Sequence, residues 1–535
     1  MTFPRLLLLA SLCLGCATAG DTPAGDGPPP ISAAESLRDG QEALERGDFE
    51  GALGTLDQSA RAASAEEDPE SLAGALFARA QAQSALGEYA AARATLLEAL
   101  ARAEALEDGP SQAAAVVALG GIELALGDAT PAGDRLREGE SMAGKEGLPA
   151  LQAAALNDLG NLQWLGGNAE QAADLYLRAA DRAFAGRDPG LAALALANAA
   201  RAQWKDPDRA LASVGRAEEA LAQVPGSHTR AALFLNLGLG VAGAAADWPA
   251  RAPALRARAK GLLESALGVA QAQQDARIEA HALGALGALE EEEGRPAEAL
   301  ALTDRALVAG RFLDAPELSY RWEAQRGRLL AASGRQSDAI AAFERSVATL
   351  DLLRSRKGWG GDLADSSFEV SVAPIYRALL DEWVNAALEE TNPAARQEIL
   401  VKTRAVMESF KAAELRDYFR DDCVDAQRAR TRELEAVSSE ATIIYPILLP
   451  ERTALTLGAD DVCRELSAVP VPGAEVEAEA RALRSQLERQ ATRRYLGPAR
   501  RLYDWLIRPL GARLEEAGSD TLVFVPDGAL MLIPM

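Results

Sequence analysis

The sequence is poor in the residue types that carry most enzyme chemistry. It has two histidines and four cysteines among 535 residues, which leaves little material for zinc sites or nucleophilic dyads. Aromatic residues make up 5% of the chain, too few for the stacking platforms that bind single-stranded nucleic acid. It also contains no GxGxxG motif after a strand, no P-loop and no GxSxG elbow. We therefore expect no cofactor and no bound metal.

Charge and composition narrow the class further. Acidic residues outnumber basic ones by 79 to 55, and the formal charge of −24 argues against nucleic acid as a partner. Hydrophobic residues at 48% and charged residues at 25% are typical of folded globular proteins. At about 150 residues per domain, the chain holds roughly three or four domains, or one long repeat array and a further domain.

Residues 1–19 have the plan of a secretory leader, and residues 20–31 form a flexible linker. Arg5 precedes an apolar run over 6–14 that is too short to span a bilayer, and small residues follow. Residues 12–16 resemble a bacterial lipobox, which implies that Cys16 is lipidated. Ordinary secretion through the A-x-A motif at 17–19 is one alternative, and a buried N-terminal helix is another. We expect a bacterial envelope protein, lipid-anchored or periplasmic/secreted, that meets the membrane only through Cys16.

A forty-residue repeat is the clearest pattern in the chain. Glycine adopts the positive φ that a helix end requires, and small residues let paired helices approach closely. The forty-residue spacing is interrupted near Lys205 and by a longer unit near Trp248, and then resumes. The pattern predicts about eight helical hairpins over 32–350. The turn glycines are Gly47, Gly87, Gly127, Gly167, Gly294 and Gly334, and the small crossing residues are Gly40, Ala80, Gly120, Gly160 and Ala200.

Each unit combines an apolar helix, a turn such as Gly47-Asp48-Phe49, and a second helix with alanine at the crossing. These features resemble tetratricopeptide (TPR) repeats, in a longer form of about forty residues. A different helical solenoid is the alternative. The resemblance implies that the first helices line a groove that binds a peptide or protein segment. The interval places five residues on the groove side: Asn157, Asn161, Trp164, Arg201 and Arg328.

The side chains of these five residues suit peptide recognition. Amide and guanidinium groups at successive helical turns can hydrogen-bond an extended peptide backbone or its carboxylates. The alternative is that they are ordinary solvated surface residues.

The repeat stops near Leu350, and residues 351–440 are predicted to be a helical connector. It contains amphipathic segments over 368–388 and 401–423. At Ala441 the pattern becomes β, and ATIIYPILLPERTALTL predicts a hairpin with a Pro-Glu-Arg turn. A long helical stretch over 474–516 and an apolar strand over 521–526 are predicted to follow.

Four segments of this region resemble the start of a CHAT domain. They lie in order between Glu408 and Met535: ESFKAAELRDYFRDDC, IIYPILLPERTALTL, RRLYDWLIRPL and LVFVPDGALMLIPM. The CHAT family comprises caspase-like cysteine peptidases that commonly follow TPR repeats. The resemblance implies an α/β sheet between helices, with a His–Cys dyad on later strands whose thiolate attacks a peptide carbonyl.

The sequence departs from this family at the catalytic positions. It ends at Met535, where other members continue, and no histidine follows His281. The remaining thiols, Cys423 and Cys463, do not match the family's nucleophile. We expect them to be buried thiols or, alternatively, to form a disulfide. We therefore expect no catalytic residue and no peptide hydrolysis by the chain as it stands.

The predicted fold class is mainly α: a TPR-like α-solenoid of about eight hairpins, a helical connector, and an incomplete α/β caspase-like (CHAT) region over 441–535. The predicted function is a secreted or lipid-anchored scaffold that binds a protein or peptide in its groove. The alternative is the N-terminal portion of a TPR-gated CHAT cysteine peptidase whose catalytic half is missing from this chain.

Overall fold

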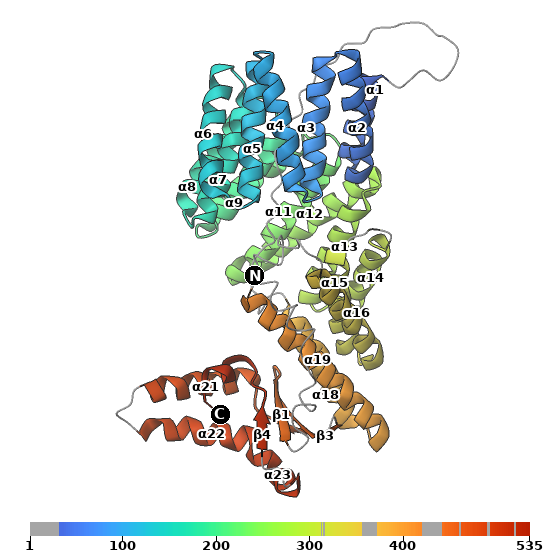
Figure 1. Cartoon of the computed structure of the whole chain (residues 1–535), viewed down its shortest axis with the longest axis vertical. Coiled ribbons are helices and arrows are strands. Elements are labelled where there is room, and N and C mark those ends of the chain that lie inside the picture. Colours follow the sequence, from blue (N-terminus) through green and yellow to red (C-terminus); the bar gives the residue numbers. More distant parts are fainter. Residues whose placement is uncertain are drawn as a thin grey trace, which may run out of the picture. The chain divides into compact units, whose positions relative to one another are not determined.

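The computed structural model describes residues 32–311, 313, 316–355, 372–419, 441–459, 462–488, 493–517 and 521–534. These residues fall into two compact units, a solenoid unit within 5–313 and a C-terminal unit within 314–535. The described chain is mainly helical, with repeated helical hairpins that resemble a TPR solenoid and a small mixed sheet (Figure 1).

The described part of the solenoid unit consists of seven helical hairpins. Each odd-numbered helix from α1 to α13 contacts the next odd-numbered helix. In a curved stack, the layer whose helices approach one another most closely lies on the inner side, so the odd-numbered helices form the inner layer. The hairpins are α1 (Ala33–Arg46) with α2 (Phe49–Glu66), α3 (Pro69–Ala85) with α4 (Tyr89–Ala105), α5 (Gly109–Ala125) with α6 (Ala129–Lys145), α7 (Pro149–Leu165) with α8 (Ala169–Ala185), α9 (Pro189–Ala202) with α10 (Pro207–Leu221), α11 (His228–Asp247) with α12 (Ala252–Gln273) after η1 (Pro249–Arg251), and α13 (Ala276–Glu292) with α14 (Pro296–Ala309).

The predicted roles of the repeated small residues are confirmed. All six predicted turn glycines have positive φ, for example +88° at Gly127. Where helices cross, a Cβ on Gly120 would lie 2.7 Å from the Leu136 Cγ atom, so the glycine lets the two helices pack closely. Aspartates cap the starts of several inner helices, and the Asp108 carboxylate accepts a hydrogen bond from the Ser111 amide.

The first hairpin of the solenoid contacts the sixth. Helix α1 contacts α11, and the turn that joins α1 to α2 lies against His228, the first residue of α11. The His228 ring packs edge-on against Phe49 at a centroid distance of 5.1 Å, and its Nδ1 atom lies 2.5 Å from the Asp275 carboxylate. The first hairpin is therefore tied to the sixth and, through Asp275, to the start of the seventh.

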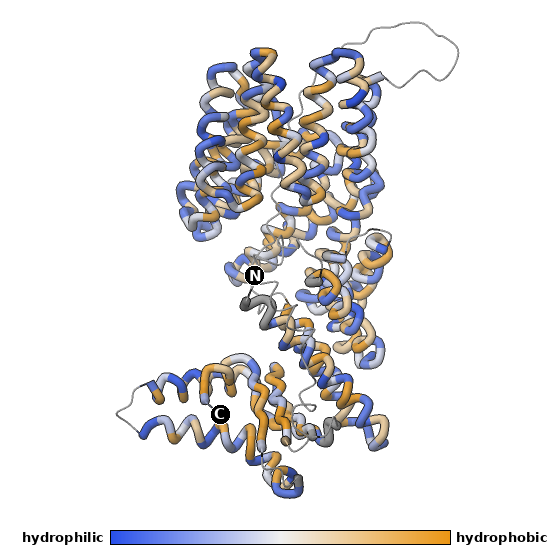
Figure 2. The backbone as a smooth tube through the Cα atoms, viewed as in Figure 1, coloured by the Kyte–Doolittle hydropathy of each residue, from blue (hydrophilic) through white to orange (hydrophobic). Residues whose placement is uncertain are grey.

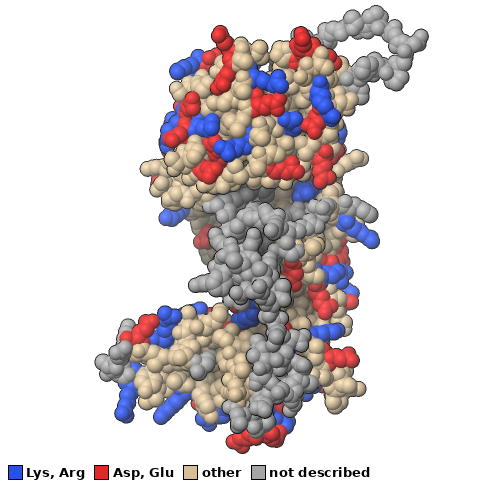
Figure 3. Space-filling model, in the orientation of Figure 1, with Lys and Arg blue, Asp and Glu red and all other residues tan. Residues whose placement is uncertain are grey.

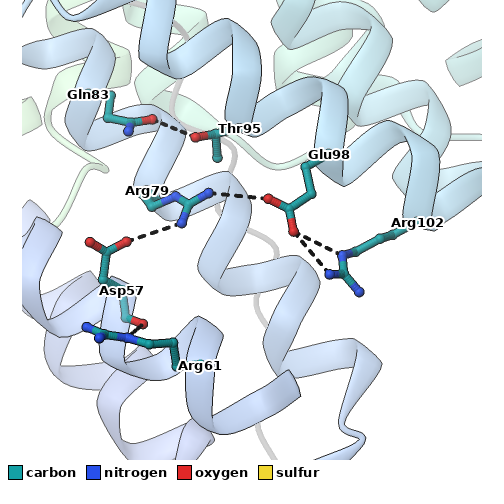
Figure 4. A network of polar contacts seen from close by, with 7 residues as sticks. All are labelled: Asp57, Arg61, Arg79, Gln83, Thr95, Glu98 and Arg102. Atoms are coloured by element: carbon teal, nitrogen blue, oxygen red, sulfur yellow. Dashed lines mark hydrogen bonds and ion pairs between the residues drawn. The ribbon is translucent and has the colours of Figure 1, made fainter. Parts of the chain in front are cut away.

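Ion pairs connect the first two hairpins. The Arg79 guanidinium on α3 lies 3.2 Å from Asp57 on α2 and 3.6 Å from Glu98 on α4 (Figure 4). Glu98 also pairs with Arg102 one turn along its own helix. Acidic and basic side chains are interspersed over the first hairpins (Figure 3), which is typical of a solvated surface.

The described residues of the C-terminal unit form an eighth hairpin, two further helices and a helix-covered sheet. The prediction of about eight hairpins is thus matched by seven in the solenoid unit and one here. The elements are α15 (Pro316–Ala332), α16 (Gln336–Ser355), α18 (Ala373–Glu389), α19 (Pro393–Phe419), β1 (Ala441–Leu448), β2 (Thr453–Ala459), β3 (Val462–Val469), α21 (Gly473–Glu488), η3 (Arg493–Tyr495), α22 (Leu496–Leu506), η4 (Arg508–Leu510), α23 (Gly511–Ala517), β4 (Thr521–Phe524) and η5 (Gly528–Leu532).

Four described strands form a mixed sheet in the order β3-β2-β1-β4. The predicted hairpin is confirmed, because β1 and β2 pair antiparallel with Ile444 opposite Leu457. The predicted apolar strand is also confirmed as β4, which pairs parallel to β1. The predicted helical stretch consists of α21, α22 and α23 with short 3-10 turns, and β3 was not predicted.

Helices cover both faces of this sheet. One face of β1 and β2 packs against α21 and α22 in a shared apolar cluster that includes Ile444, Leu455, Val476 and Leu502. On the other face, the Tyr445 hydroxyl donates a hydrogen bond to Glu408 of α19. Figure 2 shows the strands as a strongly hydrophobic part of this unit. β1 is buried along its whole length, as expected for a strand covered on both faces. The caspase-like fold implied by the CHAT resemblance stays a prediction.

A buried ion pair attaches α19 to the end of the sheet. The Lys411 ammonium lies 2.6 Å from the carboxylate of Asp527, which is 2% exposed and follows β4. The other Asp527 oxygen accepts a hydrogen bond from the Leu448 amide at the end of β1. Lys411 also lies 3.0 Å from Glu414. This pair fixes the turn after β4 against both β1 and α19.

Candidate functional site on the inner helices

Four of the five predicted groove residues lie together on α7 and α9. Helix α7 begins with Pro149, whose fixed φ suits the first helical position, and ends before Gly167, which has a φ of +80°. Because α7 and α9 are adjacent inner helices, positions one repeat apart meet across their interface. Their side chains form a cluster of amides, aromatic rings and charged groups.

A buried carboxyl group accepts hydrogen bonds from two amides in the buried part of this cluster. One Asp158 oxygen accepts hydrogen bonds from the side-chain amides of Asn157, at 3.2 Å, and Asn161, at 3.1 Å. The Asn157 oxygen in turn accepts a hydrogen bond from Asn198 of α9, at 3.0 Å. Asn157, Asp158 and Asn161 are 0%, 4% and 8% exposed, respectively. The chain of amides therefore links α7 to α9 inside the solenoid.

An aromatic and cationic layer adjoins the amides. The Tyr176 hydroxyl of α8 donates a 2.8 Å hydrogen bond to the Asn161 oxygen. The Arg201 guanidinium lies 5.2 Å from the centre of the Trp164 ring, a cation–π arrangement that orients both side chains. Trp164 and Arg201 are partly exposed. They form the accessible part of the site.

Burial changes the acid–base properties of the cluster. Loss of water around Asp158 raises the pKa of its carboxyl group to about 7, although the hydrogen bonds from Asn157 and Asn161 oppose the shift. Burial also raises the pKa of Tyr176 to about 12, against the opposing effect of the Arg201 charge. The tyrosine therefore stays a hydrogen-bond donor at neutral pH, while Asp158 titrates near neutrality.

The predicted groove residues have different surroundings in the structure. Asn157 and Asn161 use their amides within the buried layer, whereas Trp164 and Arg201 reach the surface. Arg328 is an exposed residue of α15 in the other unit. Peptide binding by any of the five stays a prediction. Cys16 lies outside the described residues, so its lipidation also stays a prediction.

Sequence reasoning missed three members of the cluster: Asp158, Tyr176 and Asn198. Two of them carried a usable signal. The sequence signal for Tyr176 is that it stands where earlier units have leucine. In the structure its ring packs against Gly160, where a Cβ would lie 2.6 Å from the ring. Asn198 follows Asn157 by 41 residues, about one repeat. Nothing in the sequence distinguishes Asp158 from an ordinary surface acid.

The structure describes two further groups that bear on chemistry. Both histidines belong to the solenoid unit, His228 at the start of α11 and His281 within α13. Cys463 lies in β3, and Cys423 lies outside the described residues. In the described part of the chain, no group of three or more His, Cys, Asp and Glu residues is placed to hold a metal ion. The expected absence of a catalytic dyad stays a prediction.

Helix α11 has the length and composition of a membrane-spanning segment, the one such helix in the described ranges. Half of its apolar window is buried within the structure, and a packed core helix passes the same test. The contacts of α11 with α9, α12 and α13 are those of a core helix.

Comparison with known proteins gives structural matches only. No family model and no curated protein matches the chain. The apo quorum sensor NprR from B. thuringiensis aligns at 12% identity over 70% of this chain and 98% of its own, with a TM-score of 0.36. A Rap protein complexed with competence and sporulation factor aligns at 14% identity over 67% and 99%, with a TM-score of 0.36. A STAND protein with a tetratricopeptide repeat sensor from Pyrococcus horikoshii aligns at 11% identity over 71% and 54%, with a TM-score of 0.35.

Proposed function

We propose that the chain is a protein-interaction scaffold whose solenoid binds a peptide or protein segment at α7 and α9. The observation that carries the proposal is the partly exposed pair of Trp164 and Arg201 above a buried, hydrogen-bonded layer. The exposed part of the Arg201 guanidinium offers hydrogen-bond donors to a ligand carbonyl or carboxylate.

The arrangement suits a peptide more than a small molecule. The Trp164 ring offers flat apolar area for a side chain, and the Arg201 guanidinium offers donors for a main-chain carbonyl or a terminal carboxylate. The buried layer beneath holds Trp164 and Arg201 in place, because α7 and α9 are linked through Asn157 and Asn198. A rigid support of this kind lowers the entropy cost of binding.

Selection of peptides from a displayed random library against the full chain tests this proposal. We expect Trp164→Ala and Arg201→Ala to weaken the selected peptides by about tenfold or more in fluorescence anisotropy, since aromatic and arginine contacts dominate interfaces. Arg178→Ala is the matched control, because Arg178 is exposed on α8 and pairs with Asp174. Equal affinity for all four proteins would show that the site lies elsewhere.

We also propose that the protein is exported and that Cys16 carries a lipid. The leader pattern of residues 1–19 supports this assignment. Mass spectrometry of the mature N-terminus is the test. A diacylglyceryl-modified Cys16 is the expected result, an N-terminus at Gly20 would support ordinary secretion, and retention of Met1 would exclude both.

A second candidate function is the N-terminal part of a CHAT peptidase gated by the solenoid. The parallel pairing of β1 with β4, between helices on both faces, favours it because parallel strands belong to α/β sheets. β4 is the end strand of the described sheet, and its Leu522 is 48% exposed. A further strand would cover this edge.

Translation of the DNA beyond codon 535 separates the two candidates. Strands that carry a histidine and a cysteine, with thiol-dependent peptide cleavage by the longer product, would establish the peptidase. Without them, we expect the chain to cleave no peptide in the presence of reductant. Cleavage by the 535-residue chain itself would refute the scaffold proposal.

A further inference from the structure

A strongly basic segment lies at η3, α22 and η4 of the C-terminal unit. Residues 493–510 contain five arginines and a single acidic residue, Asp504, in a chain whose formal charge is −24. Figure 3 shows basic side chains along the part of the unit formed by α21 and α22. The local charge is therefore opposite in sign to that of the whole protein.

Two of these arginines are neutralised by neighbouring carboxylates. Arg501 lies 2.8 Å from Glu479 of α21, and Arg508 lies 2.6 Å from Asp504. The other three are exposed and have no carboxylate within ion-pair distance among the described residues. They are Arg493, Arg494 and Arg500.

Apolar side chains accompany the unpaired arginines on the outer side of α22. The buried side of the helix presents Pro498, Leu502 and Leu506 to the core. Leu496, Arg500 and Tyr503 follow one another at helical spacing on another side, and Leu496 and Tyr503 are 39% and 53% exposed. Arg493, Arg494, Leu496, Arg500 and Tyr503 are together called the arginine face.

We propose that the arginine face binds an acidic segment of a partner protein. The guanidinium group presents a planar fork of donors that matches a carboxylate, and its attraction is sensed locally because salt screens the distant negative charges of the chain. Leu496 and Tyr503 would contact the apolar stems of the acidic side chains. The arginine face belongs to the C-terminal unit and shares no residue with the solenoid site, so the proposal does not depend on the proposed function.

An anionic membrane fits the arginine face less well than an acidic protein segment. A helix that lies in a membrane interface buries a continuous apolar face in the lipid. In α22 that face is occupied by the core of the C-terminal unit, which leaves Leu496 and Tyr503 as its exposed apolar side chains. Binding to lipid is therefore an outcome that the experiment must distinguish.

The test measures binding of a fluorescein-labelled oligoglutamate peptide to the full chain by fluorescence anisotropy, at low and at physiological salt. An oligoglutamine peptide of the same length controls for non-electrostatic binding. We expect the variant R493E/R494E/R500E to weaken oligoglutamate binding by about tenfold or more, and salt to weaken binding by the wild type. The neutral variant R493Q/R494Q/R500Q should give a smaller loss and replaces the first if charge reversal impairs folding.

The matched control is R137E/R178E/R335E, which changes the net charge by the same amount. These three arginines are exposed, and each pairs with a carboxylate on its own helix or the adjoining turn. Equal losses in both triple variants, or no binding by the wild type, would overturn the proposal. Binding of phosphatidylglycerol vesicles through the arginine face, without binding of the peptide, would overturn it in favour of a membrane.

Discussion

Replacement of Asp158 by asparagine should change how the solenoid responds to pH. The folded state holds this carboxyl group with a pKa of about 7, whereas the group has its ordinary value of 3.8 when the chain unfolds. Between these values the folded state binds a proton that the unfolded state does not. The stability of the wild type therefore falls as the pH rises from about 4 to about 7, and changes little above that range.

The size of the effect follows from the shift and the burial. One pKa unit corresponds to about 1.4 kcal/mol, so the full difference of about three units is worth roughly 4 kcal/mol. Because part of the shift lies below pH 5, we expect about 2 to 3 kcal/mol between pH 5 and pH 8. The asparagine introduced by D158N can accept the same two amide hydrogen bonds through its side-chain oxygen, so this variant should keep the local geometry.

Amide hydrogen exchange of the full chain measures this difference locally. Wild type and D158N are compared at the same pH, so that the intrinsic exchange rates cancel. Relative to the wild type, D158N should protect peptides of α7 and α8 more at pH 8 than at pH 5. Glu138→Gln is a suitable control because Glu138 is exposed on the outer helix α6. A D158N-to-wild-type difference that is the same at both pH values would refute the assignment of Asp158 as a buried, titrating group.

Three further predictions test the packing. Gly127→Ala should lower the melting temperature and cost about 1 kcal/mol of stability, because the new Cβ meets no atom but alanine is strained at a φ of +88°. Gly54→Ala, inside α2, should instead raise the melting temperature and add about 1 kcal/mol of stability, because alanine favours the helix more than glycine does. Lys411→Met should destabilise the C-terminal unit by about 3 to 5 kcal/mol, measured by hydrogen exchange of β1 and β4, because Asp527 is left buried without its cation. A further Asp527→Asn change should recover part of the lost stability. Unchanged exchange in the Lys411→Met variant would contradict the pairing. His228→Ala should speed exchange in α1 and α2 but not in α5 and α6, because it removes the contacts with Phe49 and Asp275; uniform protection would show that the first hairpin is held otherwise.

The regular part of the fold could be predicted because its determinants are local. A turn glycine such as Gly127 and a crossing glycine such as Gly120 report a positive φ and a close approach within one hairpin. The return of α1 onto α11 had no such signal, since it depends on small rotations added over five repeats. Strand β3 was missed because Arg464 and Glu465 interrupt its apolar pattern, as is common in an end strand.

The candidate site lies where the sequence departs from the repeat pattern. Tyr176 replaces the leucine of earlier units, and its hydroxyl needs an acceptor inside a layer otherwise built from alanine and leucine. Asn161 supplies that acceptor, and its amide then requires Asp158, which brings a carboxyl group into the interior. A buried polar network of this kind contributes less to stability than apolar packing would. A repeat that contains such a network is therefore less stable but holds its polar groups in a specific arrangement. The departure at Tyr176 therefore lies beside the same inner helices, α7 and α9, on which Trp164 and Arg201 are partly exposed.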